Sequence, residues 1–256
     1  MSKKAAKLKE KRNKKIERIR SRRRKRLYLI ISVIAVVTLL SWLTYTSNFF
    51  NVQEIKVKGN VNVSDQFVIE KSGIKRSQSM ISLPSITVSK RLKKINWVAH
   101  AAIMKDWPYT VIIDVIERKP LAFMENDEDV YLIAKKGFVI DIIANYKGKK
   151  QLPKIDGLPV KKVKIGSRLK NDALDNALLA YTKLSQELQK DVFSITAKSV
   201  DELYFVAQGV EIIYGKAEKT RMKNEVIKTI LKEKKETIST IDVRIPEKPV
   251  VRLLGK

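Results

Sequence analysis

The chain has 256 residues, a formal net charge of +26, one histidine and no cysteine. Without cysteine, disulfide bonds, thiolate metal sites and cysteine nucleophiles are excluded, and a single histidine excludes a metal site built from several histidines. The hydrophobic content of 44% is sufficient for folded domains.

The basic charge is concentrated at the N-terminus. Residues 1–26 hold 15 basic and two acidic side chains, whereas residues 27–53 hold no charged side chain. The basic run 21–26 is similar to a nucleic-acid-binding patch, but no aromatic side chain is interleaved for base stacking. Anionic lipids of the inner leaflet would attract such a tail. We therefore expect this tail to contact membrane lipids and no nucleic acid.

The uncharged run predicts a transmembrane helix over residues 27–46. About 20 helical residues cover the roughly 30 Å hydrocarbon core of a bilayer. The run is longer than the apolar part of a signal peptide, and no A-x-A-like cleavage site follows it. The positive-inside rule then places the tail in the cytoplasm and residues from about 47 onward outside the cell. The residues expected to anchor the two ends of the helix are Leu27, Tyr28, Trp42 and Tyr45.

Residues 50–119 are expected to form a first folded domain with the order β-α-α-β-β. Residues 52–58 alternate apolar and polar side chains, as a half-buried strand does. The other elements expected here are helices at 64–73 and 89–95, and strands at 98–105 and 110–117 that flank a turn at 106–109.

Residues 120–252 are expected to form a second, larger α+β domain, followed by a short tail at 253–256. Short strands are predicted between residues 120 and 143, with the acidic segment 125–129 as a solvated hairpin loop. The later elements are an amphipathic helix at 172–188, strands at 194–197, 203–207 and 210–214, a helix at 219–232 and a strand at 238–245.

Three segments of the first domain resemble the POTRA domain of the FtsQ/DivIB cell-division family. They are Phe50-x-Val52-x-x-Ile55-x-Val57-x-Gly59-Asn60, Trp107-Pro108-Tyr109-Thr110-Val111 and Glu117-Arg118-Lys119-Pro120-Leu121-Ala122. The resemblance continues through residues 130–140, 152–157, 210–215, 219–232 and 241–244. It implies an α+β fold in which a single transmembrane helix precedes an extracellular POTRA domain and a larger β domain. The short basic tail and the lack of cysteine are most similar to a Gram-positive DivIB.

The resemblance also implies a function without enzymatic activity or a cofactor. The chain would be a bitopic scaffold of the divisome, a single-pass type II protein of the cell membrane that is enriched at the division septum. Its implied partners are FtsL, a DivIC/FtsB-type protein and the septal penicillin-binding protein, and it would help regulate septal peptidoglycan synthesis.

Two alternatives remain open, a membrane-anchored envelope peptidase or hydrolase and a POTRA-type chaperone for exported proteins. Residues 79–84 superficially resemble the serine–methionine segment of type I signal peptidases, but the proline is misplaced. The lysine content leaves a Ser–Lys dyad possible. The lone His100 is expected to be structural or exposed.

Partner binding is expected at a sheet edge, because an added strand satisfies unpaired backbone groups. In the family, a partner chain adds at the C-terminal edge. The resemblance therefore implies partner binding by Ser239, Thr240, Ile241, Asp242, Val243, Arg244 and Ile245, with Lys223 and Lys228 of the neighbouring helix. An interior position of this strand remains the alternative. If the strand is an edge, Val243→Pro should abolish partner binding and leave the fold largely intact.

Overall fold

The computed structural model describes residues 25–39, 41–42, 48–126, 129–145, 152–158, 163–234 and 238–254. Residues 25–39 and 41–42 are helical. Within the described residues, no helix combines the length and the apolar character needed to cross a membrane. Residues 40 and 43–46 of the predicted span, Tyr45 among them, lie outside the described residues, as do residues 1–24 of the basic tail.

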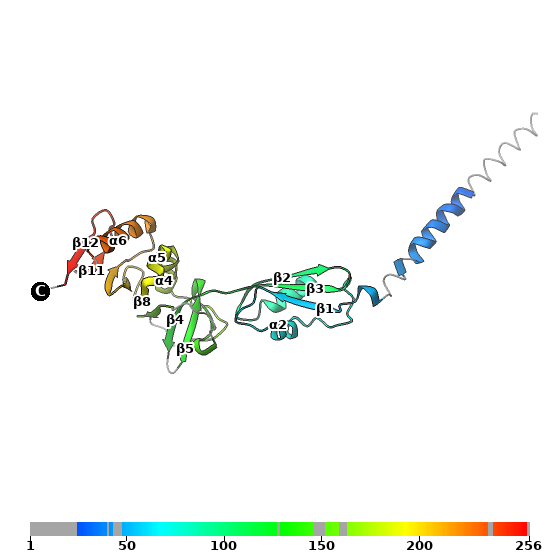
Figure 1. The fold of residues 1–256 in the computed structure, drawn as a ribbon, viewed down its shortest axis with the longest axis horizontal. Helices are drawn as coiled ribbons and strands as arrows, with labels where there is room; N and C mark the ends of the chain where they lie inside the picture. The colour runs from blue at the N-terminus through cyan, green and yellow to red at the C-terminus, as the bar shows by residue number, and fades with distance from the viewer. Residues whose placement is uncertain are drawn as a thin grey trace, which may run out of the picture. The chain divides into compact units, whose positions relative to one another are not determined.

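A three-stranded sheet with the order β1-β3-β2 carries the first set of elements (Figure 1). These elements are η1 (Asn48–Phe50), β1 (Glu54–Lys58), α2 (Asp65–Ser72), α3 (Ser85–Leu92), β2 (Val98–Asp106) and β3 (Thr110–Glu117). The predicted order β-α-α-β-β is confirmed for this part of the chain.

Local signals set the ends of the two helices. The hydroxyl of Ser64 caps α2 by accepting from the backbone N–H of Phe67 at 3.3 Å, and Gly73 ends the helix with a left-handed φ of 66°. Helix α3 was expected at 89–95 but begins directly after Pro84. The buried pair Val88 and Leu92 defines its inner face, and this spacing fixes the face of a helix without fixing its ends.

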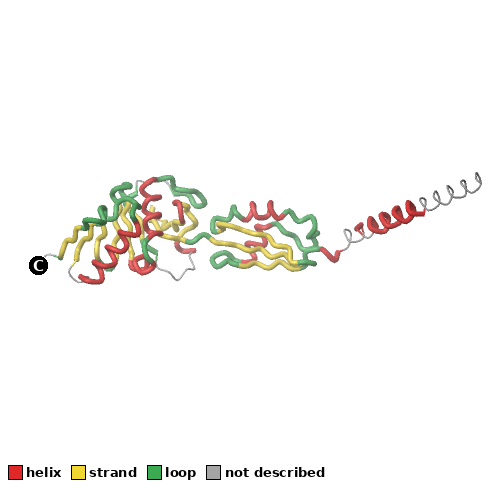
Figure 2. Tube along the Cα trace, turned by 90° about the horizontal axis from the view of Figure 1, so that it is seen from above, coloured by secondary structure: helices red, strands yellow, loops and turns green. Residues whose placement is uncertain are grey.

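A nine-stranded mixed sheet with the order β12-β11-β10-β9-β8-β7-β4-β5-β6 forms the larger part, with helices packed against its strands (Figure 2). The pairs β4–β7, β7–β8 and β10–β11 are parallel. The elements are β4 (Pro120–Asn126), β5 (Asp129–Ala134), η2 (Lys135–Gly137), β6 (Phe138–Ile142), η3 (Ile143–Asn145), β7 (Lys154–Asp156), α4 (Asp172–Lys183), α5 (Gln186–Asp191), β8 (Val192–Ala197), β9 (Leu203–Ala207), β10 (Val210–Ile213), α6 (Thr220–Lys234), β11 (Ile238–Asp242) and β12 (Val250–Leu253).

Two expectations for this part are wrong in detail. The helix predicted at 172–188 is divided, because Leu184 adopts an extended conformation and the hydroxyl of Ser185 caps α5 by accepting from Leu188 N at 3.3 Å. The strands on either side of the acidic hairpin reach further than expected, to Asn126 and from Asp129.

The core of the larger part lies between the sheet and helix α4. Leu174, Leu178 and Tyr181 of α4 are buried in the core cluster, and α4 packs against strand β8. The rings of Phe205 and Tyr214 pack edge to face, with centroids 5.2 Å apart. Burial of these large apolar side chains is the main source of stability for the sheet.

Candidate functional site

The strand predicted to receive a partner is an interior strand in this structure. Strand β11 pairs in parallel with β10 and antiparallel with β12. The expectation of a free edge at residues 239–245 is therefore wrong. The physical reason is a chain reversal over residues 243–249, where Lys248 N donates to Ile245 O at 3.0 Å. Pro246 lies within this loop, after which the chain returns to the sheet.

The outer edge is formed by β12 instead. Within the residues that the structure describes, this strand pairs only with β11, in the registers 240↔252, 241↔251 and 242↔250. The side chains of Val250 and Leu253 are 58% and 59% exposed, and Val251 packs partly against the core. Backbone groups of β12 that point away from β11 thus form an edge to which another strand can add.

The residues of β11 (Ile238–Asp242) and the residue that follows it are mostly engaged in the sheet. Ile241 and Val243 are fully buried, and Val243 N donates to Ile213 O at 3.0 Å. A proline at 243 would remove this interior hydrogen bond. We therefore expect Val243→Pro to destabilise the fold, contrary to the expectation from the sequence. Ser239 and Thr240 are half-buried, whereas Ile245 is exposed on the loop.

Asp242 and Arg244 close the turn that follows β11. The guanidinium of Arg244 donates to Oδ2 of Asp242 at 2.6 Å and to Oδ1 at 3.1 Å, and Arg244 N donates to Asp242 Oδ1 at 3.0 Å. The hydrogen bond from Arg244 lowers the pKa of Asp242, although partial burial opposes this effect. The pair holds the start of the loop that leads to β12.

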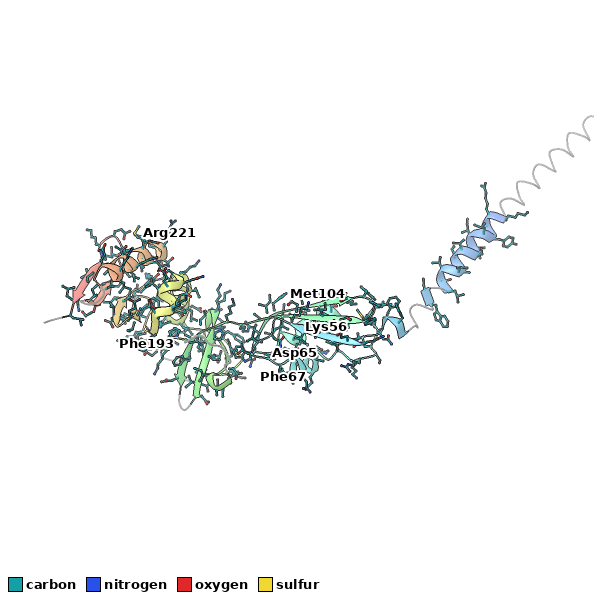
Figure 3. The ribbon with its side chains drawn as sticks, viewed as in Figure 1. Lys56, Asp65, Phe67, Met104, Phe193 and Arg221 are labelled. Atoms are coloured by element: carbon teal, nitrogen blue, oxygen red, sulfur yellow. The ribbon has the colours of Figure 1, made fainter. Side chains whose placement is uncertain are left out.

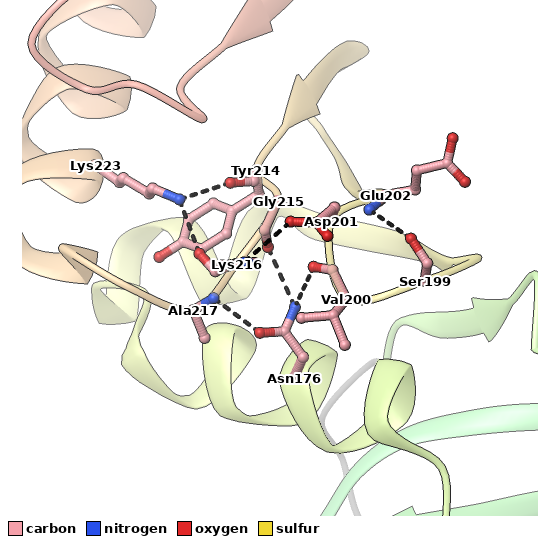
Figure 4. A network of polar contacts seen from close by, with 10 residues as sticks. All are labelled: Asn176, Ser199, Val200, Asp201, Glu202, Tyr214, Gly215, Lys216, Ala217 and Lys223. Carbon is pink, nitrogen blue, oxygen red and sulfur yellow. Dashed lines mark hydrogen bonds and ion pairs between the residues drawn. The ribbon is translucent and has the colours of Figure 1, made fainter.

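Lys223 is buried, and its predicted role in a surface contact is not compatible with its position. Its ammonium donates to Tyr214 O at 2.7 Å and to Lys216 O at 2.8 Å, and lies 4.5 Å from the centroid of the Tyr214 ring (Figure 4). Burial lowers the pKa of Lys223, while the nearby charges of Glu218 and Asp242 oppose the shift. Lys223 therefore fixes the end of β10 from within.

Other basic residues of α6 remain at the surface. Lys228 is exposed and pairs with Glu187 of α5 at 2.8 Å. Its hydrogen bond lowers the pKa of the Glu187 carboxylate. Arg221, two residues before the buried lysine, is also exposed (Figure 3). Lys228 is accessible to a partner, but its present ion pair joins two helices of the same domain.

Asn176 is a structural residue that the sequence analysis did not identify. From helix α4, its amide nitrogen donates to Val200 O at 3.1 Å and Gly215 O at 3.2 Å, while its oxygen accepts from Ala217 N at 2.8 Å (Figure 4). It thereby ties the helix to the chain segments that follow β8 and β10. The only sequence signal is an asparagine, a weak helix former, inside an amphipathic helix.

The residues considered for chemistry take structural positions. Among the described residues, no group of three acidic, histidine or cysteine side chains is placed to hold a metal. His100 is exposed on β2. In the segment 79–84, Met80 is buried, and the hydroxyl of Ser82 donates to Ser79 O at 3.3 Å. The Ser82 hydroxyl thus has a backbone carbonyl as its hydrogen-bond partner.

Comparison with known proteins gives two family matches and a set of distant relatives. The family described as "POTRA domain, FtsQ-type" matches residues 50–118, and "Cell division protein FtsQ/DivIB, C-terminal" matches residues 122–244. The chain is 23% identical over 224 residues to "Cell division protein FtsQ" of Streptomyces bingchenggensis, covering 83% of this chain and 80% of the relative. It is 24% identical over 205 residues to "Cell division protein DivIB" of Clostridium tetani, covering 78% and 76%.

Proposed function

Because the chain belongs to the FtsQ/DivIB family of cell-division proteins, we propose that it is a bitopic scaffold of the divisome. Members of this family are divisome proteins without enzymatic activity, which confirms the prediction that the chain is not an enzyme. The proposed partners are FtsL, a DivIC/FtsB-type protein and the septal penicillin-binding protein, through which it would help regulate septal peptidoglycan synthesis. Some relatives are named FtsQ and others DivIB, so the assignment of this chain to the Gram-positive DivIB type stays a prediction.

We further propose that residues 27–46 anchor the protein in the cell membrane, with residues 1–26 in the cytoplasm and folded domains at 50–119 and 120–252 outside. The uncharged sequence between residues 27 and 53 supports this proposal. Leu27, Ile34 and Trp42 are each more than half exposed, as lipid-facing side chains would be. The hydroxyls of Ser32 and Thr38 donate to carbonyls of the preceding helical turn, which satisfies them without water.

The observation that carries the proposed scaffold role is the outer position of β12. A partner strand would pair with the free side of β12, next to the exposed side chains of Val250 and Leu253. This places the partner one strand further out than residues 239–245. Those residues would support binding by holding β12 in register, and direct contact would be limited to the loop around Ile245.

The proposal is tested by comparing proline and alanine at two adjacent positions of β12. In an antiparallel pair, successive N–H groups point to opposite sides, so one of Arg252→Pro and Leu253→Pro removes a donor that faces the partner. That variant should bind the purified DivIC/FtsB-type partner at least about tenfold more weakly. A tenfold change in Kd corresponds to about 1.4 kcal/mol, which is the net contribution of roughly one hydrogen bond between uncharged groups. Binding is measured by calorimetry with the full chain in detergent micelles.

The matched controls are Arg252→Ala and Leu253→Ala, which keep the N–H groups and remove the same side chains. They should bind within about threefold of the unsubstituted chain. Both alanine variants, and the proline variant whose N–H faces the partner, should keep its thermal midpoint, whereas the other proline variant loses a hydrogen bond to β11 and should be less stable. Unchanged affinity in both proline variants, or an equal loss in the alanine variants, would refute strand addition at β12.

A further inference from the structure

An exposed apolar surface lies at the end of the three-stranded sheet where β1 begins, β2 ends and β3 begins. Its members come from three separate segments, η1, the loop between α2 and α3, and the turn between β2 and β3. Phe49 is 60% exposed, Ile81 45%, Trp107 51% and Tyr109 40%. We call these four residues the apolar tip.

The tip is held by backbone hydrogen bonds and ring contacts. Val52 N donates to Gln78 O and Met80 N donates to Phe50 O, both at 2.8 Å, and Gln53 N donates to Tyr109 O at 2.9 Å. The three segments are thus fastened to one another. These backbone hydrogen bonds keep the exposed side chains together at one end of the sheet.

Aromatic ring contacts continue this arrangement toward the N-terminus. The ring of Phe50 packs edge to face on that of Phe49, with centroids 5.1 Å apart, and on that of Trp107 at 5.6 Å. Phe50 is only partly exposed. The exposed rings of Phe49 and Trp107 therefore both pack against Phe50, and together they form a single surface.

The proposed membrane anchor ends close to this surface. Phe49 lies three positions after Thr46, the end of the anchor, and three extended residues reach at most about 11 Å. Tryptophan and tyrosine favour the membrane–water interface, because their rings are apolar and their N–H and O–H groups are polar. Lys75 and Arg76, exposed in the same loop as Ile81, supply positive charge for anionic headgroups.

We propose that the apolar tip lies in the headgroup region of the outer leaflet and acts as an interfacial anchor for the first folded domain. The proposal rests on the membrane anchor at residues 27–46. The proposed occupant of the tip is a lipid surface and not a protein. The reason is that the anchor would hold this part of the chain close to the bilayer. The tip would restrict the orientation of the folded domains relative to the membrane.

Tryptophan fluorescence tests the proposal, because the chain has only Trp42, Trp97 and Trp107. The full chain is reconstituted into vesicles of phosphatidylglycerol and phosphatidylethanolamine, with and without phospholipids brominated near the glycerol end of the acyl chains. In a Trp42→Phe chain, bromine should quench the emission of Trp107. The further substitution Trp107→Phe should remove most of this quenching, because Trp97 is only 7% exposed.

A second variant distinguishes a failure of this proposal from a failure of the proposed anchor. Trp107→Phe with Trp42 retained reports whether residues 27–46 enter the bilayer. Quenching of Trp42 without quenching of Trp107 would overturn the apolar tip and keep the anchor, and absence of both would overturn the anchor as well. A blue-shifted Trp107 emission that bromine does not quench would show that protein covers the tip, which also overturns the proposal.

Discussion

A carboxylate clamp at Glu117 holds the segment that leads into helix α2. The side chain of Glu117 accepts from the backbone N–H groups of Val61, Asn62 and Val63 at 2.9 to 3.1 Å, and from the side-chain amide of Asn62 at 2.8 Å. Glu117 ends β3, about 55 residues further along the chain. The clamp therefore joins the end of the sheet to the start of the first helix.

Glu117→Gln removes the charge and turns one acceptor into an amide group that faces N–H donors. Hydrogen bonds to a charged group contribute about 1.5–3 kcal/mol. Because the carboxylate is only partly buried, we expect a loss of about 1–2 kcal/mol in the free energy of opening this segment. At 1.36 kcal/mol per factor of ten, this equals roughly 5- to 30-fold faster amide exchange.

Hydrogen exchange of the full chain in detergent micelles, read by mass spectrometry, measures this change. Peptides covering residues 61–72 should exchange faster in Glu117→Gln, whereas those covering β9 and β10 should not change. Glu70→Gln, an exposed change of the same charge on α2, should exchange like the unsubstituted chain. Equal exchange of residues 61–72 in both variants would refute the clamp.

Three further predictions concern stability and titration. Lys223→Met leaves the carbonyls of Tyr214 and Lys216 without their buried donor, and should lower the unfolding free energy by about 2–3 kcal/mol in denaturant titrations, against less than about 0.5 kcal/mol for the exposed Arg221→Met. Gly59→Ala should lower the thermal midpoint far more than Gly209→Ala. Both glycines have a left-handed φ, but a Cβ at 59 would lie 2.1 Å from Val115 O, and one at 209 meets nothing within 4 Å. The pKa of Asp242, measured by NMR, should lie below the usual value of about 3.9 and should rise in Arg244→Met. Because the folded state stabilises the carboxylate, the contribution of this pair to the unfolding free energy is present above about pH 4. It is lost as the pH falls through the lowered pKa.

The elements with strong local signals could be predicted from the sequence. Strand β3 alternates buried and less buried side chains at the residues expected, and the buried spacing of Val88 and Leu92 identified a second helix. The capping residue Ser64 and the left-handed Gly73 mark the ends of α2. In each case, the information lies within a few neighbouring residues, which is the range over which capping and periodicity act.

The candidate site depends on contacts between distant residues, and this part could not be predicted. Pro246 reads as the end of a strand, whereas the chain reverses and adds β12 outside β11. Lys223 lies in a strongly basic helix, and nothing in its sequence context separates it from the exposed Arg221. Its burial is set by the carbonyls at the end of β10, which the fold brings to it.

Photocrosslinking in growing cells tests the central claim that a divisome partner adds to the outer side of β12. A photoreactive phenylalanine analogue replaces Leu253, and in a matched chain it replaces Phe193 of β8, which is similarly exposed at 61% (Figure 3). The account predicts that Leu253 crosslinks to the ectodomain of a DivIC/FtsB-type protein, while Phe193 gives little or no such product. A partner that crosslinks from Phe193 as strongly as from Leu253, or from neither, would contradict it.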